Sequence, residues 1–143
     1  MIRYLCDTSA LIAAVSSWHE HHDRTCVEIE RRKRSNQQLV LAAHSLAETY
    51  AVLTRLPAPH RLRSADAIAL IEQNWKDTPI VHLTGAEMWN ALHEAQRRAM
   101  VGGQMYDVLI AVAALKAEAS TVMTWNVRHY GAFAPSIAVE TPP

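Results

Sequence analysis

Three of the fourteen acidic residues stand where a carboxylate could do chemistry. Asp7 directly follows the strand-like run at residues 2–6, and Glu48 lies early in an expected helix. Asp107 is the single charged residue in the apolar stretch 105–115. An isolated buried carboxylate is costly unless it is paired or binds a cation, and no basic residue lies within a helical turn of Asp107. Because carboxylate oxygens bind hard cations, convergence of these acids would indicate a Mg²⁺ or Mn²⁺ site.

Each acid also has a structural explanation that involves no chemistry. Asp7 could cap the first helix, which is worth about 1 kcal/mol. The spacing from Ser45 to Glu48 matches a capping box, in which the Glu side chain accepts a hydrogen bond from the cap residue's N–H. Asp107 could complement the helix dipole as an acid in the first turn. Taken singly, Asp7 and Glu48 favour the structural explanation, whereas the cost of burial favours chemistry for Asp107.

The elements that must position these acids alternate between strands and helices. Strands are expected at residues 2–6, 39–41, 79–83 and 121–124, with a fifth at the edge over 137–139. Helices are expected at residues 10–14, 20–34, 45–53, 64–75, 84–98 and 105–115. This alternation implies βαβ crossovers, so the predicted fold class is α/β with a central parallel sheet of four or five strands, covered on both faces. Ligands bind at the carboxyl edge of such sheets, where the three acids are expected to meet.

Two of the expected helices carry large side chains at helical spacing. One face of each helix is therefore predicted to pack inward. The predicted inward-facing residues are Leu46, Tyr50 and Leu53 in the first helix and Ile68, Ile71 and Trp75 in the second.

Charge and composition exclude several classes of protein. Fourteen Lys and Arg residues balance fourteen Asp and Glu residues, so nucleic-acid binding would need local basic patches. Two cysteines exclude a disulfide framework and a four-thiolate zinc site. No apolar run reaches the roughly 18 residues of a membrane helix, and the N-terminus has no signal-peptide pattern. The 143 residues predict a single domain, 1–143, of a soluble cytoplasmic protein.

Four short blocks of sequence carry a resemblance to a known family. They lie at residues 4–12 (YLCDTSALI), 44–50 (HSLAETY), 106–111 (YDVLIA) and 122–130 (VMTWNVRHY). In their order and spacing they resemble the PIN-domain ribonucleases, in particular the VapC toxins of bacterial and archaeal toxin–antitoxin pairs. The resemblance implies a PIN-like α/β/α sandwich around a parallel sheet, in agreement with the fold class expected from the alternating pattern.

The resemblance also implies catalytic roles for four residues. Asp7 and Asp107 resemble the family's direct Mg²⁺ ligands, with Mn²⁺ as the alternative ion. Glu48 resembles its third acid, which holds metal-bound water or a second ion. At the fourth catalytic position Asn126 stands where many members have an acid. Its amide can hydrogen-bond water or phosphate but brings no charge.

Residues beside these four are assigned supporting or substrate-binding roles. Thr8 and Ser9 are expected to orient Asp7 or the metal-bound waters. Thr124 shares a block with Asn126, and Arg128 is a candidate RNA contact. The other candidate cations are Arg61, Arg63, Arg97, Arg98 and the run 31–34, of which the run is better explained as a solvated helix end.

Two further features have competing explanations. Trp125 could stack on an unpaired base, or it could be a core or dimer-interface aromatic. His19, His21 and His22 could bind zinc or nickel, but no thiolate or carboxylate pattern completes such a site. A polar loop between helices is the favoured explanation for these three histidines.

The implied function is a Mg²⁺-dependent endoribonuclease that cleaves RNA with a metal-activated water, as the toxin of a type II toxin–antitoxin (VapBC-like) pair. The implied partners are RNA, a VapB-like antitoxin and a second copy of the chain in a homodimer, with no membrane. The alternative is a PIN-like module that binds RNA or a protein partner with weak or no cleavage, which the amide at Asn126 favours. A phosphatase using Asp7 as nucleophile is disfavoured because Ser9 stands where such enzymes place a second Asp.

Overall fold

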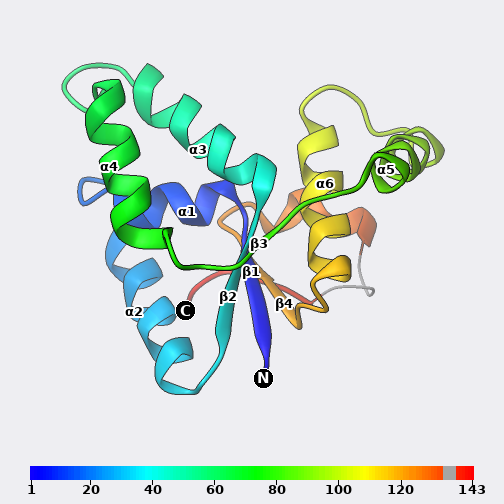
Figure 1. The fold of residues 1–143 in the computed structure, drawn as a ribbon, viewed down its shortest axis with the longest axis horizontal. Helices are drawn as coiled ribbons and strands as arrows, with labels where there is room; N and C mark the ends of the chain where they lie inside the picture. The colour runs from blue at the N-terminus through cyan, green and yellow to red at the C-terminus, as the bar shows by residue number, and fades with distance from the viewer. Residues whose placement is uncertain (134–137) are drawn as a thin grey trace.

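A five-stranded parallel sheet forms the centre of the molecule. The computed structural model describes residues 1–133 and 138–143, and its strand order is β3-β2-β1-β4-β5 (Figure 1). Every neighbouring pair of strands is parallel. The strands are β1 (Arg3–Cys6), β2 (Gln38–Ala42), β3 (Ile80–Val81), β4 (Thr121–Met123) and β5 (Ala138–Glu140). The predicted fold class, α/β with a central parallel sheet, is confirmed.

Helices cover both faces of this sheet (Figure 1). They are α1 (Thr8–Val15), α2 (His22–Arg34), α3 (Ala43–Arg55), α4 (Ser64–Trp75), α5 (Gly85–Arg97), α6 (Gln104–Lys116) and the 3₁₀ helix η1 (Val127–Phe133). Successive strand residues point to opposite faces. Accordingly Leu5 packs in one core with residues of α5 and α6, whereas Tyr4 and Cys6 pack in another with residues of α1, α3 and α4.

The N-termini of α1 and α3 test the capping roles proposed for Asp7 and Glu48. Asp7 is the N-cap of α1, and its Oδ1 accepts a hydrogen bond from the Ala10 amide at 3.1 Å. In contrast, α3 begins earlier than predicted, with Ala42 as its N-cap and no side-chain cap. The capping box predicted for Ser45 and Glu48 is therefore wrong, because both residues lie inside the helix. Glu48 loses its purely structural explanation, and Asp7 keeps its own.

The predicted inward faces of α3 and α4 are partly wrong. Tyr50 is 37% exposed and Ile68 is 46% exposed. The prediction is confirmed for Leu53, Ile71 and Trp75, which are buried. The other buried positions of the two helices are Ser45 and Thr49 in α3 and Ala67 in α4. Small side chains such as Thr49 and Ala67 occupy the buried positions because α3 and α4 pack against each other, and close helix packing leaves little room there.

The two edges of the sheet differ slightly from expectation. At one edge β3 has only two residues, Ile80 and Val81, which pair with Leu41 and Ala42. At the other edge β5 begins at Ala138. Residue 137 of the predicted fifth strand lies outside the described residues.

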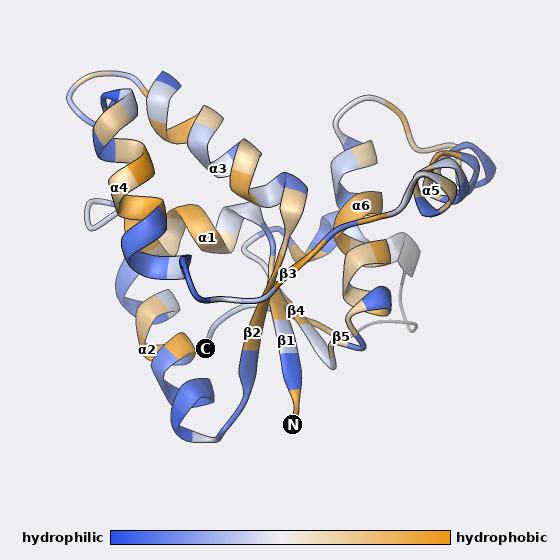
Figure 2. Cartoon of the chain, viewed as in Figure 1, coloured by the Kyte–Doolittle hydropathy of each residue, from blue (hydrophilic) through white to orange (hydrophobic). Residues whose placement is uncertain are grey.

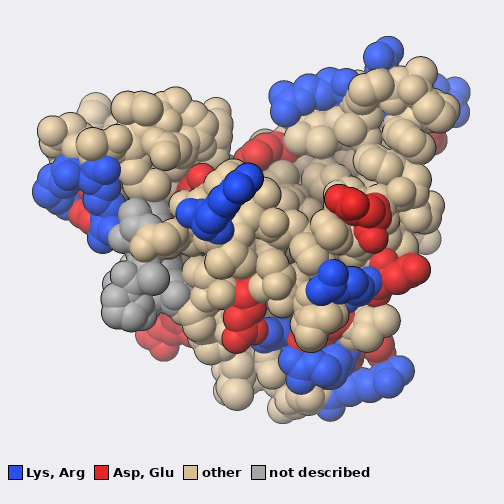
Figure 3. All heavy atoms as spheres, turned by 180° about the vertical axis from the view of Figure 1, so that it is seen from behind, with Lys and Arg blue, Asp and Glu red and all other residues tan. Residues whose placement is uncertain are grey.

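Hydropathy and charge are distributed as this architecture requires. Hydrophobic residues gather on the strands and on α6, whereas α2 is mostly hydrophilic (Figure 2). Seen from behind, Lys and Arg form several separate groups, both in the middle of this face and at its edges, with acidic residues between them (Figure 3). Within the described ranges, no helix is both long and apolar enough to cross a membrane.

Candidate active site

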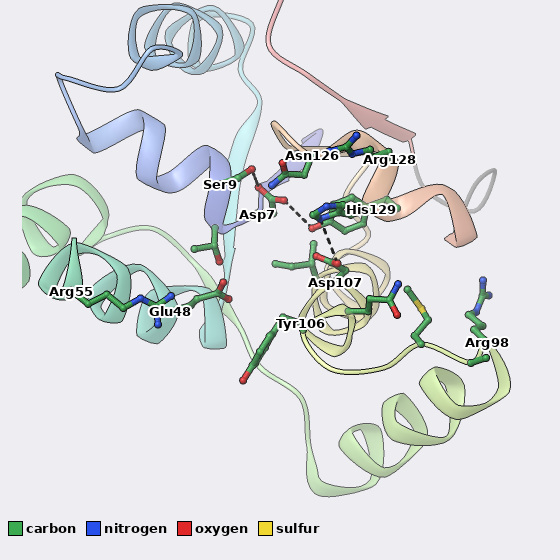
Figure 4. Close-up of a pocket in the computed structure, with 17 residues that line it drawn as sticks. Asp7, Ser9, Glu48, Arg55, Arg98, Tyr106, Asp107, Asn126, Arg128 and His129 are labelled. Carbon is green, nitrogen blue, oxygen red and sulfur yellow. Dashed lines mark hydrogen bonds and ion pairs between the residues drawn. The ribbon is translucent and has the colours of Figure 1, made fainter. Parts of the chain in front are cut away.

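A cavity of about 870 Å³ opens at the carboxyl edge of the sheet. Asp7 reaches it from the end of β1, Glu48 from α3 and Asp107 from the first turn of α6 (Figure 4). The sequence-predicted residues that line it are Asp7, Thr8, Ser9, Glu48, Asp107, Asn126 and Arg128. Thr124 lies beside the cavity and contacts Asp7. The structure thus brings together residues from four separate parts of the chain, while their chemical roles stay predictions.

The Asp7 carboxylate is held by four hydrogen bonds. Its Oδ1 accepts from the Ser9 hydroxyl at 2.6 Å and from the amide of Ala10. Its Oδ2 accepts from the Thr124 hydroxyl at 2.5 Å and from the Tyr130 hydroxyl at 2.9 Å. With only 5% of the residue exposed, these donors fix the orientation of the carboxylate.

Ser9 and Thr124 also hold the loop that carries Asn126. The Ser9 hydroxyl oxygen accepts from the Trp125 amide, and the Thr124 hydroxyl oxygen accepts from the Asn126 amide, each at 2.9 Å. The same two hydroxyls therefore connect the start of α1, the end of β4 and the loop before η1. This arrangement accounts for both residues as positioning groups for Asp7.

Asp107 has a less favourable electrostatic environment. Burial raises the pKa of its carboxyl, and the negative charges of Asp7 and Glu48 raise it further. The imidazole of His129, whose Nδ1 lies 3.7 Å from Oδ2 of Asp107, acts in the opposite direction. The raised pKa thus reflects mainly the burial of this carboxyl, with added repulsion from the two neighbouring acids. A bound cation would lower the free energy of all three ionised acids.

The side chains of the cavity offer the oxygen ligands that a hard divalent cation prefers. Three carboxylates face one cavity, and oxygen ligands are those that Mg²⁺ and Mn²⁺ prefer. As the side chains stand, no three acidic, imidazole or thiol groups within residues 1–133 and 138–143 are grouped closely enough to hold a metal ion. Within these same ranges Glu48 makes no side-chain hydrogen bond or ion pair. Its carboxylate could therefore rotate toward a bound ion without breaking such a contact.

Three arginines line the same cavity as the acids: Arg55, Arg98 and Arg128. Arg98 also pairs with Glu94, with Nε lying 2.6 Å from Oε1. The sequence singled out Arg98 and Arg128 but missed Arg55. The signal was present, because Glu48 and Arg55 are seven residues apart and so lie on the same face of a helix two turns apart.

The other predicted cations lie elsewhere. Arg97 pairs with Glu94, and Arg63 pairs with Asp66 at 3.2 Å. Arg61 donates to the carbonyl oxygen of Leu56. None of the three lines the cavity within the described part of the chain.

The run 31–34 only partly matches its interpretation as a solvated helix end. Arg32 is 6% exposed, and its guanidinium pairs with Glu28 at 3.1 Å and with Glu140 at 2.8 Å. The interpretation is wrong for this residue, because the charge of Arg32 is satisfied inside the protein. The Arg32–Glu140 pair connects α2 to β5.

Trp125 is engaged by neighbouring side chains. Its ring stacks on His21 with centroids 3.8 Å apart and planes 8° apart, and the Arg24 guanidinium lies 5.0 Å from the ring centroid. The indole N–H donates to the Thr25 hydroxyl at 2.9 Å. These contacts favour the packing explanation for Trp125 over base stacking, because a base would have to displace His21 or Arg24.

The histidine cluster also has local partners. His21 stacks on Trp125, a ring nitrogen of His22 lies 2.8 Å from the Ala13 carbonyl oxygen, and Nδ1 of His19 accepts from the His21 amide at 3.1 Å. These contacts order the turn between α1 and α2, as the loop interpretation predicts.

Two tyrosines at the cavity escaped the sequence analysis. Tyr130 is 2% exposed and donates to Asp7, whereas Tyr106 is 55% exposed and directly precedes Asp107. Both lie within blocks that carry the family resemblance. No local sequence signal shows that the Tyr130 hydroxyl is a buried donor or that the Tyr106 ring is exposed.

Comparisons with known proteins identify the family of this chain. Residues 4–130 match the PIN domain family. Ribonuclease VapC40 of Mycobacterium tuberculosis is 32% identical over 126 residues, which cover 85% of each chain. Ribonuclease VapC27 of the same organism is 32% identical over 113 residues, covering 79% of this chain and 70% of the relative.

Solved structures show the same fold at lower identity. VapC20 of Mycobacterium tuberculosis, described as a Sarcin-Ricin loop cleaving toxin, aligns with a TM-score of 0.72 and 19% identity over 98% of this chain and 99% of its own. VapBC2 of Rickettsia felis, bound to a DNA fragment from its promoter, aligns with a TM-score of 0.72 and 17% identity over 98% of each chain. FitAcB of Neisseria gonorrhoeae has a TM-score of 0.68 and 17% identity over 97% of each chain. From its matched residues and its relatives, the chain belongs to the PIN domain family and is a homologue of the VapC ribonucleases.

Proposed function

We propose that this protein is a Mg²⁺-dependent endoribonuclease and the toxin of a type II toxin–antitoxin pair. The observation that carries the proposal is the convergence of Asp7, Glu48 and Asp107 on one cavity at the carboxyl edge of a PIN fold. Homology to proteins named as VapC ribonucleases supports RNA as the substrate.

In the proposed mechanism each acid has a different task. Asp7, held by four donors, and Asp107, whose charge is only partly neutralised, are the ligands that hold the ion. When bound, the ion lowers the pKa of a coordinated water and offsets charge on the scissile phosphate. Glu48, with its carboxylate facing the cavity, orients the attacking water in line with the bond to be broken. The expected products carry 5′-phosphate and 3′-hydroxyl ends.

The cationic residues of the cavity bind the rest of the substrate. Arg55 and Arg128 are both exposed and line the cavity, so their guanidinium groups are available to the phosphates that flank the cleaved bond. Asn126 lies in the same lining and offers an amide to a phosphate oxygen or to a bound water. With an amide rather than a fourth acid, the cavity repels RNA less than a four-acid site would.

The proposed protein partner is a VapB-like antitoxin, bound to a homodimer of this chain. Two of the solved structures with the same fold are described as VapBC2 bound to promoter DNA and FitAB bound to a DNA fragment. Three carboxylates in one cavity would attract a cationic side chain, so an antitoxin arginine inserted there would block substrate and ion together.

The decisive experiment is cleavage of purified total RNA by the isolated protein, with Mg²⁺ or with EDTA. We expect discrete fragments only with Mg²⁺, and none from an Asp107→Asn variant. The matched control is Asp66→Asn, which makes the same charge change in the exposed ion pair with Arg63 on α4, away from the cavity. Cleavage by a folded Asp107→Asn variant at the wild-type rate would contradict the mechanism.

One alternative function has an observation of its own in favour. The amide of Asn126 stands where an acid is common, which suits a module that binds RNA or a protein partner without cutting. Absence of cleavage with either Mg²⁺ or Mn²⁺, from folded protein free of antitoxin, would support this alternative.

A further inference from the structure

Tyr106 is the exposed aromatic residue of the candidate active site. It occupies the first turn of α6, one residue before Asp107, and 55% of it is exposed. The other tyrosine in the described lining, Tyr130, is 2% exposed and bonded to Asp7. In Figure 4 the Tyr106 ring extends from the start of α6 toward the side on which Glu48 lies, with its hydroxyl directed away from Asp107. The ring therefore presents an aromatic surface at the cavity.

The Tyr106 ring is supported from behind by His44. The two rings are stacked, with centroids 6.3 Å apart and planes 19° apart. This separation lies within the range of offset aromatic pairs. His44 lies at the start of α3, and burial lowers the pKa of its imidazole, which keeps the ring uncharged at neutral pH. An uncharged, half-buried ring suits a supporting surface better than a contact for phosphate.

The loop before α6 holds Tyr106 at this position. Gly102 has a φ of +58°, a left-handed conformation that glycine adopts without strain. The side chain of Gln104 accepts from the Val101 amide at 2.9 Å, which closes the turn at the start of α6. The turn before α6 thus has a defined backbone conformation that places Tyr106 at the cavity.

Two partly exposed tryptophans, Trp125 and Trp18, are already stacked on histidines. Trp125 stacks on His21, and Trp18 stacks on His60 with centroids 4.2 Å apart. A base could reach either indole only by replacing a protein ring. Tyr106 has a ring partner, His44, and a large exposed fraction in addition.

Building on the proposed function, we infer that Tyr106 is a base-stacking residue for RNA and that the substrate is unpaired at the nucleotide it contacts. Tyr106 and Asp107 both line the cavity from the first turn of α6, so one strand of RNA can contact the ring and the acids together. A nucleotide's base and its phosphate are joined only through its sugar. A phosphate held at the acids can therefore place a neighbouring base on Tyr106. Bases that stack on aromatic side chains in this way come from single strands, loops or bulges.

The test measures RNA binding without cleavage. All variants carry Asp107→Asn, and the probe is a short, fluorescently labelled, unstructured RNA that spans the preferred cleavage site. We expect Tyr106→Ala to weaken binding roughly 5- to 150-fold, the effect of losing one stacked base. Tyr106→Phe keeps the ring and should bind within about twofold of the parent. Trp89→Ala is the matched control, because Trp89 is 66% exposed on α5 and does not line the cavity.

A second series locates the stacked base. The same RNA is made with a single abasic nucleotide at each position in turn, and each is bound to the parent and to Tyr106→Ala. At one position beside the cleavage site the two changes should be non-additive, since each removes the same contact. Equal binding by the parent and a folded Tyr106→Ala variant would overturn the inference. Additive losses at every position would overturn it as well.

These outcomes are separable from those of the proposed function. If the wild-type chain cleaves RNA while Tyr106→Ala binds it normally, the nuclease proposal stands and the stacking residue is wrong. If the wild-type chain cleaves no RNA, the nuclease proposal fails. Binding of a generic unstructured RNA by the tyrosine variants then tests the stacking contact alone, by the same fold-changes.

Discussion

Asp7 and Asp107 are two carboxylates of one cavity with opposite surroundings. Asp7 accepts four hydrogen bonds, from three hydroxyls and one backbone amide, and is 5% exposed. The side chain of Asp107 is 21% exposed and lies 3.7 Å from His129, and burial and neighbouring acids raise its pKa. Asp7 is thus a rigid part of the fold, whereas Asp107 lies in surroundings that disfavour its charge. In the proposed cation site, Asp7 would fix the position of the ion and Asp107 would add to its affinity.

Replacing either aspartate with asparagine should have the largest effect on RNA cleavage, but only one replacement should change stability. Both Asp7→Asn and Asp107→Asn should reduce RNA cleavage to the level seen in EDTA, since each removes a metal-binding charge. Only Asp7→Asn should destabilise the fold, by about 1–3 kcal/mol, because the amide keeps one acceptor oxygen and the donors to the other oxygen lose their acceptor. Asp107→Asn removes a repelled charge and should leave the free energy of unfolding unchanged or higher. Urea unfolding in EDTA measures this, and equal losses in the two variants would refute the comparison.

Metal binding should stabilise the wild-type protein through the same charge. At a Mg²⁺ concentration 100-fold above its dissociation constant, the folded state should gain about 2.7 kcal/mol. Asp107→Asn should lose most of this gain, and Asp66→Asn should keep it. Thermal melts with Mg²⁺ at constant ionic strength provide the measurement. A gain that is unchanged in Asp107→Asn would place the ion elsewhere.

The Tyr130 hydroxyl should act on Asp7 as a positioning group. Removing it in Tyr130→Phe keeps the buried ring but takes away one of the two donors to Oδ2 of Asp7. Loss of such a supporting hydrogen bond typically weakens metal affinity about 10- to 100-fold. Mn²⁺ binding measured by electron paramagnetic resonance would show this apart from cleavage. Wild-type affinity in the variant would mean that Thr124 alone fixes this oxygen.

The smallest expected effect is the contribution that Asp107 makes to the pH dependence of stability. A carboxyl whose pKa is raised by folding binds more protons in the folded state than in the unfolded state. Its contribution to stability therefore falls as pH rises through the window between the ordinary value near 4 and the raised value. In EDTA, the wild type should be less stable than Asp107→Asn at neutral pH, and the gap should close as pH falls through that window. A gap that stays constant with pH would contradict the raised pKa.

Much of the fold could be predicted from local sequence. Within residues 1–133 and 138–143, the alternation of β-rich runs with helices identified the five strands and six α-helices to within a few residues, because periodicity and Pro or Gly breaks are local signals. The placement of Asp7, Glu48 and Asp107 at one sheet edge followed from the parallel topology alone. What the pattern could not predict was the exact buried face of α3 and α4, which depends on how two helices pack together.

Residue type and spacing along the chain were enough to predict the fold class, the family and the acids that share the cavity. Which hydroxyls hold Asp7 depends on the three-dimensional packing, since Tyr130 is 123 residues away from it in the chain. The packing also decided that Arg32 is buried against Glu140 and that Trp125 is covered by His21 while Tyr106 is exposed. These contacts join residues distant in sequence, and the energy of a polar or aromatic contact depends on neighbours that local sequence does not specify.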